Sequence, residues 1–227
     1  IEVPGGAEDI RRVLKVNETE DTEPGAYQFV TVGIRHATLS HLVYAWLTPF
    51  TDIRSAKETT GGSTDAEFMR INQFYMQTSQ NMAKYQGLKT AGKDIELKYL
   101  GVYVLTVTDN STFKGILNIA DTVTAVNDKT FDSSKDLVDY VNSQQLGDTV
   151  KVTYEEDGKV KSAEGKIITL ENGKNGIGIG LIDRTEVTSD VPIRFSTAGI
   201  GGPSAGLMFS LAIYTQIADP ELRNGRV

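Results

Sequence analysis

The segment that decides the fold reads Phe195-Ser-Thr-Ala-Gly-Ile-Gly-Gly-Pro-Ser-Ala-Gly-Leu-Met-Phe-Ser-Leu-Ala-Ile-Tyr214. It begins in the β-prone run 191–197, turns through a glycine-rich corner and continues as a strongly apolar helix. Pro203 presets φ for a helix start, which places Ser204 beside the unpaired N–H groups of the first turn. A developing oxyanion can be held there, although a serine that caps the helix explains the same pattern.

Two familiar motifs do not fit this corner. Gly202-Pro-Ser-Ala-Gly206 has the G-x-S-x-G form of a nucleophile elbow, which needs a histidine after the serine. The chain has only His36 and His41, both far upstream. A P-loop is excluded because Leu207-Met208 stands where Lys-Ser/Thr should follow. A nucleophilic serine here would therefore need a desolvated lysine as its base.

The run Ile200-Gly-Gly-Pro-Ser-Ala-Gly-Leu-Met-Phe209 resembles the serine motif of Lon-type proteolytic domains, which use a Ser-Lys dyad. The resemblance implies that Ser204 is the nucleophile. It implies a dyad lysine further on in the chain, whereas the last lysine of this sequence is Lys174. It also implies an oxyanion site in the backbone of the corner, formed by Gly202, Pro203, Ser204 and Ala205. The strand before the corner is expected to align substrate through Phe195, Ser196 and Thr197.

Composition limits the class of protein. The 227 residues can bury one large core or two modest ones, and 39% hydrophobic with 23% charged residues is ordinary for a soluble globular protein. A net charge of −7 without a basic cluster argues against a nucleic-acid partner. There is no cysteine, so no disulfide or thiolate metal site can form. No apolar run reaches the length of a membrane span, and no signal peptide is visible.

The first part of the chain alternates strand and helix signals. Residues 27–35 alternate as a strand, and a short helix is predicted over 39–47, stopped by Pro49. His36 and His41 flank this corner, and isolated histidines of this kind are more often structural than metal ligands.

A long helix follows. Ser63 or Thr64 caps its start, and Gly87 closes it after about Tyr85. Apolar residues within it recur at steps of three and four, which predicts one buried face and a structural role.

From residue 95 the pattern changes to β. The predicted elements are a strand over 95–108 interrupted at 99–102, a strand over 120–128, a helix over 135–144, and a hairpin of 149–154 with 159–169. This succession resembles a PDZ domain. Tyr99-Leu-Gly-Val102 matches its carboxylate-binding loop, and Asp121 matches its Gly-Asp turn with Ala120 in place of glycine. Asn127-Asp128 matches its Val-Asn-Gly turn.

The PDZ resemblance implies a peptide-binding site. The N–H groups of Leu100, Gly101 and Val102 would bind a terminal carboxylate. The edge of 102–106, including Val104, would accept a peptide as an extra strand. Leu137 and Val141 would wall the side-chain pocket, although the same apolar residues also serve as the small core.

Glycines mark the segments that flank the PDZ-like block. Gly92-Lys93 before it and 172–176 after it contain glycines that would allow the block to swing. Ile177-Gly-Ile-Gly-Leu-Ile182 reads as a strand whose bare positions let another backbone approach. A dinucleotide fingerprint is a weak alternative there because no helix follows, and we expect no cofactor.

The order of these parts resembles the membrane-anchored, ATP-independent PDZ–Lon-like proteases of Gram-positive bacteria (the YlbL/SepM type). The resemblance implies an α+β fold in which residues 1–95 and 171–227 share a discontinuous Lon-like lobe, with a PDZ domain inserted over 96–170. It also implies a membrane helix before residue 1, an active site on the outer face of the membrane, and a homo-oligomer.

Two function hypotheses follow. The preferred one is a serine endopeptidase that cleaves peptides or unfolded proteins at the outer cell surface, matures secreted signalling peptides, and uses the PDZ domain for recognition. Because the dyad lysine is absent, residues 1–227 alone are expected to be inactive. The alternative is a non-catalytic PDZ module in which Ser204 only caps its helix. An esterase would need a histidine that the chain does not supply.

Overall fold

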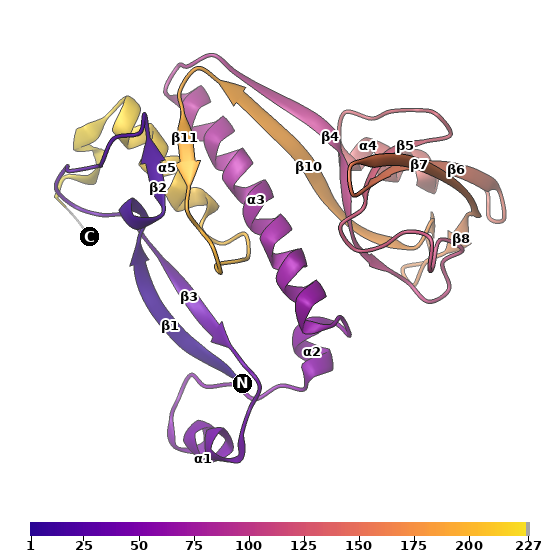
Figure 1. The fold of residues 1–227 in the computed structure, drawn as a ribbon, viewed down its shortest axis with the longest axis horizontal. Coiled ribbons are helices and arrows are strands. Elements are labelled where there is room, and N and C mark those ends of the chain that lie inside the picture. Colours follow the sequence, from indigo (N-terminus) through magenta and orange to yellow (C-terminus); the bar gives the residue numbers. More distant parts are fainter. Residues whose placement is uncertain (226–227) are drawn as a thin grey trace.

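The computed structural model describes residues 1–225, which form a mixed α and β fold of two lobes (Figure 1). Each lobe has its own buried cluster of apolar side chains. The core of the first lobe combines residues from both ends of the chain, such as Ile10 and Phe29 with Phe209 and Ile213. Within the described residues, no helix combines the length and apolarity that crossing a bilayer requires.

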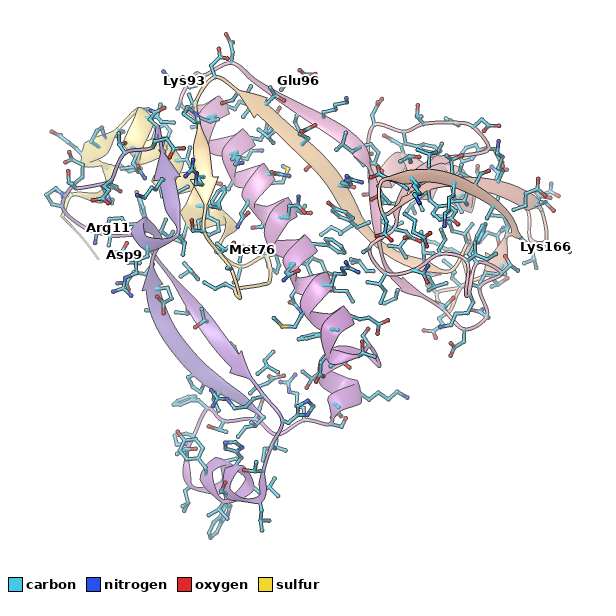
Figure 2. All side chains as sticks on the ribbon, in the orientation of Figure 1. Asp9, Arg11, Met76, Lys93, Glu96 and Lys166 are labelled. Carbon is cyan, nitrogen blue, oxygen red and sulfur yellow. The ribbon has the colours of Figure 1, made fainter. Side chains whose placement is uncertain are left out.

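Short sheets and helices build the first lobe around α3. Strand β1 (Glu2–Asp9) pairs antiparallel with β3 (Gln28–Ile34), and β2 (Leu14–Val16) pairs antiparallel with β11 (Ile193–Phe195). The helices are α1 (Leu39–Leu47), α2 (Ala56–Thr60), α3 (Asp65–Thr90) and α5 (Gly206–Ile217), with 3-10 turns η1 (Ile10–Arg12) and η2 (Pro220–Arg223). Met76 of α3 is buried in this lobe, and Asp9 and Arg11 lie where β1 meets η1 (Figure 2).

Helix α3 begins where the sequence predicts and ends later. Thr64 is its N-cap, and the Thr64 N–H donates to the Glu67 carboxylate at 2.8 Å in a capping box. The helix continues through Gly87, so the predicted stop there is wrong. A Cβ at Gly87 would lie 2.8 Å from Ile213 Cγ2 of α5, so glycine serves a close helix contact rather than a helix end.

The second lobe is a five-stranded sheet in the order β10-β4-β5-β6-β7. Its strands are β4 (Ile95–Val107), β5 (Thr122–Val126), β6 (Thr149–Glu156), β7 (Lys159–Lys166) and β10 (Ile179–Ser189). Helix α4 (Ser134–Asn142) contributes Leu137 and Val141 to its core, and a small pair of strands, β8 (Ile168–Thr169) and β9 (Asn175–Gly176), completes the lobe.

A continuous ribbon of β4 and β10 joins the lobes. The two strands pair antiparallel from Ile95 opposite Ser189 to Val107 opposite Ile179. In Figure 2, Lys93 and Glu96 mark the end of this ribbon near α3, and Lys166 lies on the far side of the sheet. The predicted interruption of the first strand is therefore only a bulge.

Helix α3 holds this ribbon with specific contacts. Thr78 Oγ1 donates to the Asp183 carbonyl at 3.0 Å, and Asn81 Nδ2 donates to the Thr185 carbonyl at 2.7 Å. The Phe74 ring stacks on Tyr103 of β4 with centroids 4.1 Å apart. These polar and aromatic contacts fix the ribbon against the first lobe.

Candidate functional site

The serine corner is fixed on α3 by backbone contacts. The Gly202 N–H donates to the Asn72 carbonyl at 2.9 Å, and Ser79 Oγ donates to the Pro203 carbonyl at 3.0 Å. A Cβ at Gly201 would lie 2.7 Å from Asn72 Cβ, so this position has no space for a larger residue. The corner therefore presents Ser204 to solvent at the start of α5.

Ser204 does not cap helix α5. The N-cap residue is Ala205, and no side-chain cap hydrogen bond is formed. Within residues 1–225, no group hydrogen-bonds to the Ser204 hydroxyl. The alternative hypothesis, in which Ser204 only caps the helix, is therefore wrong about this residue.

Within residues 1–225, two N–H groups at the corner have no partner. Among the residues that the structure describes, neither the Ser204 nor the Ala205 N–H donates a hydrogen bond. The expected contributions of Gly202 and Pro203 need correction, because the Gly202 N–H is already bound to Asn72 and proline has no N–H. The oxyanion site that this corner can offer consists of the adjacent N–H groups of Ser204 and Ala205.

Strand β11, which precedes the serine corner, is already paired with β2 along one of its edges. Phe195 pairs with Leu14 of β2, and the Ser196 N–H donates to the Val13 carbonyl at 2.7 Å. Thr197 Oγ1 accepts from Gln80 Nε2 at 2.7 Å. These three positions, predicted to align substrate, therefore also hold the lobe together, and the Ser196 N–H is not available to a peptide.

The structure adds one titratable group that the sequence does not single out. Lys84 of α3 is half-buried, with its Nζ 5.5 Å from the centroid of the Phe195 ring, and this burial lowers its pKa. Its burial depends on β11, which lies far along the sequence. Within residues 1–225, neither Lys84 nor any other lysine hydrogen-bonds to Ser204.

The peptide-binding edge predicted on β4 is wrong. Strand β4 lies between β10 and β5, and the side chains of Val102 and Val104 are fully buried in the core. Residues 99–102 form paired strand rather than a loop: Gly101 faces Arg184, and a Cβ at Gly101 would lie 2.3 Å from the Val123 carbonyl oxygen. The N–H groups of Leu100 and its neighbours therefore do not form a carboxylate-binding loop.

The sheet has two edge strands, β7 and β10, and β10 is the one that lies beside α4. The Gly178 carbonyl accepts from the Thr108 N–H at 2.8 Å, so this position faces β4. Backbone direction alternates along a strand, which turns the N–H and C=O groups of Ile179 and Leu181 away from β4. The Ser134 N–H of α4 donates to Asp183 Oδ1 at 3.1 Å and ties the helix to this strand.

A small apolar cavity lies between β10 and α4. It has a volume of about 50 Å³. Its lining includes Leu137, Val138, Val141, Ile177, Gly178, Ile179 and Leu181. Leu137 and Val141 therefore face a pocket, as predicted, but the opposite wall is β10 rather than β4. Within the described part of the chain, the Ile177 and Gly178 N–H groups have no hydrogen-bond partner.

The feature of the sequence that could have indicated this groove is the glycine-rich run 177–182. Gly178 has a φ of +73°, and a Cβ there would lie 2.5 Å from Thr108 Oγ1. Successive N–H groups at such a turn suit a carboxylate, and an open strand edge suits an extended peptide. The arrangement can therefore bind the C-terminal segment of a peptide.

The predicted turn before β5 is well formed. Asp121 is buried and accepts from the Asn118 N–H at 2.8 Å, and burial raises the pKa of its carboxyl group. Ala120 has a φ of +86°, which favours glycine, the residue that the PDZ resemblance places there. Asn127 and Asp128 also have positive φ values, which is typical of a tight turn between strands.

The two histidines make local contacts. His36 Nε2 lies 2.7 Å from Asp65 Oδ2, and His41 Nδ1 accepts from the Thr38 N–H at 3.1 Å at the start of α1. Within residues 1–225, no group of three or more metal-ligating side chains gathers.

Comparison with known proteins identifies a PDZ domain in this chain. Residues 72–167 match the PDZ domain family. A PDZ domain of an SdrC-like protein from Listeria monocytogenes is 35% identical over 38% of this chain and 93% of that chain, with a TM-score of 0.37. The corresponding Listeria innocua domain is 38% identical over 36% of this chain and 92% of that chain, with a TM-score of 0.35.

A third solved structure, from Geobacillus thermodenitrificans, is 32% identical over 35% of this chain and 94% of that chain, with a TM-score of 0.32. The search of curated proteins finds no match. The chain therefore carries a PDZ domain and belongs, through it, to the PDZ domain family.

Proposed function

We propose that this chain is the nucleophile-bearing and substrate-recognising part of a serine endopeptidase of the Ser-Lys dyad type. The observation that carries the proposal is Ser204 itself, which is exposed, lacks a hydrogen-bond partner among residues 1–225, and stands beside two free backbone N–H groups. A buried apolar helix and the Asn72 contact hold this corner rigid, as preorganised catalysis requires.

The chemistry is acyl transfer. Ser204 Oγ attacks the peptide carbonyl carbon while its proton passes to a neutral lysine amine, and the Ser204 and Ala205 N–H groups hold the oxyanion. The tetrahedral intermediate collapses, the lysine returns the proton to the leaving amine, and water then hydrolyses the acyl-serine. The proposal takes this lysine from outside the described residues, where the resemblance to Lon proteolytic domains implies one.

The PDZ domain binds the substrate in this proposal. Its support is the groove between β10 and α4, where an extended segment can add to the open edge and bury an apolar side chain against Val138 and Val141. Because β10 continues into the ribbon that contacts α3, the bound segment is held in a fixed relation to the first lobe. Binding at a remote site raises the effective concentration of peptide at the serine.

The cellular setting is also part of the proposal. The resemblance to PDZ–Lon-like proteases supports a full-length protein anchored by an N-terminal membrane helix, with its active site on the outer face and a homo-oligomeric assembly. The substrates would be unstructured peptides, including secreted signalling peptides that need maturation.

The test is cleavage of an unstructured peptide by the full-length protein. Ser204→Ala is expected to abolish cleavage, and Ser210→Ala, whose Oγ only bonds the Gly206 carbonyl within α5, is the matched control. Cleavage that persists in Ser204→Ala would show that the nucleophile lies elsewhere.

A second candidate function is peptide binding without cleavage. The family match and the open β10 edge favour it. The same assay distinguishes this function from proteolysis. The wild-type protein would bind the peptide with measurable affinity and leave it uncleaved. Ser204→Ala would change neither the binding nor the lack of cleavage.

A further inference from the structure

Helix α1 and the turn after it are not covered by the rest of the described chain. None of the nine residues of α1 is buried, and Figure 1 shows the helix at the bottom of the view, beyond the N-terminus and the nearby ends of β1 and β3. Its apolar side chains are among the most exposed of the protein: Leu39 is 79%, Trp46 85%, Leu47 68% and Phe50 87% exposed. An exposed apolar patch of this kind marks a site of interaction.

The helix is amphipathic, with its apolar face turned outward. The large exposed residues recur at steps of three and four: Leu39, Leu42, Val43, Trp46, Leu47 and Phe50. His41, Ala45 and Thr48, on the opposite side of the helix, are only half-exposed. A helix that stabilised its own domain would bury the apolar stripe instead. The stripe therefore has a function outside the fold.

The composition of this projection indicates what covers it. No carboxylate occurs from Arg35 to Thr51, although the whole chain carries a net charge of −7. Arg35, four residues before the helix, is exposed and forms no ion pair within residues 1–225. Tryptophan and other aromatic side chains are enriched where protein meets the polar edge of a bilayer, and cations there attract anionic lipid headgroups.

We propose that α1 and Phe50 form a membrane-docking element that lies in the interface of an anionic lipid bilayer. The apolar stripe enters the boundary between headgroups and acyl chains, and Arg35 contacts the headgroups. At nine residues the helix is too short to span a bilayer, so it lies on the surface.

The test uses Trp46, the only tryptophan of the chain, as its reporter. Vesicles of phosphatidylcholine alone, or of an equimolar mixture with phosphatidylglycerol, are added to the protein, and Trp46 emission and co-sedimentation are measured. The variant Val43→Asn with Leu47→Asn keeps the reporter and alters only exposed positions, at 54% and 68% exposure. Val160→Asn on β7, at 75% exposure, is the matched control.

The expected result is a blue shift of Trp46 emission and sedimentation with the mixed vesicles. The double asparagine variant should bind at least about tenfold more weakly and the control should not change, because two apolar side chains leave the bilayer interface. Arg35→Gln should weaken binding to the mixed vesicles more than to phosphatidylcholine.

Two results would overturn the proposal. One is an unchanged Trp46 spectrum with the protein left in the supernatant of both vesicle types. The other is a lipid-free dimer in sedimentation velocity that buries Trp46 and dissociates in the double asparagine variant, which would assign the face to a second copy.

Discussion

The carbonyl oxygen of Asn72, in the middle of α3, accepts a hydrogen bond from the Gly202 N–H at 2.9 Å. The same oxygen also accepts the ordinary hydrogen bond within the helix. This contact links the serine corner to α3, the helix that also holds the β4–β10 ribbon. Ser204 is therefore positioned by the same helix that holds the PDZ domain, so the proposed nucleophile and the proposed peptide site share one support.

The first prediction concerns the fit of the corner on α3. Gly201→Ala should lower the free energy of unfolding by about 1–3 kcal/mol, because the new Cβ would lie 2.7 Å from Asn72 Cβ and force the corner outward. Chemical denaturation measures the change. Gly6→Ala is the control, since only the flexible Glu8 carboxylate approaches that position, at 3.4 Å. Equal stability of the two variants would contradict the prediction, because it would show that the corner can shift to make room for the new Cβ.

A second prediction concerns the turn before β5. Ala120→Gly should stabilise the protein by about 1 kcal/mol, because φ is +86° and glycine adopts this conformation without steric cost. The same exchange at Ala91, where φ is −77°, should destabilise instead, because glycine gains freedom in the unfolded chain. Opposite signs in thermal or chemical unfolding are expected, and a loss of stability at both positions would contradict the strain at Ala120.

The third prediction is a pH dependence at Asp121, where burial raises the pKa of the carboxyl group. A raised pKa means that the folded state binds the proton more tightly than the unfolded state. Stability contributed by Asp121 should therefore fall as pH rises from about 4 through the raised pKa. As the pH rises from about 4 through the raised pKa, wild type should therefore lose stability relative to Asp121→Asn, whose side chain does not titrate. A difference that does not vary with pH would contradict this account.

The fourth prediction places the peptide on β10. Free-acid peptides should bind more tightly than their amidated forms, because the Ile177 and Gly178 N–H groups are available to a carboxylate. Val138→Asp should weaken binding by about tenfold or more, since the charge enters the apolar cavity beside α4. Calorimetry measures both effects.

The control for this prediction is Leu100→Asp, at the loop that the sequence favoured. This half-exposed position lies outside the residues that line the β10–α4 cavity, so binding should be retained in a folded variant. Loss of binding in Leu100→Asp but not in Val138→Asp would show that the peptide binds at β4 and not at β10.

Local patterns in the sequence predict the elements of this fold well. Thr64 and Ser133 cap helices as expected, because side-chain caps act within a few residues. The serine corner is likewise local, since Pro203 and its glycines determine the turn. Gly87 misled the prediction because its role is a contact with Ile213, which no local pattern reveals.

Sheet order is the part that sequence could not supply. A PDZ-like succession places a glycine near the expected loop at residue 101, but the chain returns after β7 to add β10 beside β4. That pairing joins segments far apart in sequence, and it converts an apparent edge into a central strand. The exposed edge could be found only once the register of β10 was known.

The most direct test of the central claim is acylation of Ser204. The full-length protein is incubated with a slowly hydrolysed peptide ester, and the acylated residue is identified by mass spectrometry after digestion, with Ser204→Ala as the matched control. The account predicts one acyl adduct on the peptide that carries Ser204, lost in Ser204→Ala. An adduct pattern that is the same in both proteins, or no adduct on that peptide, would contradict it.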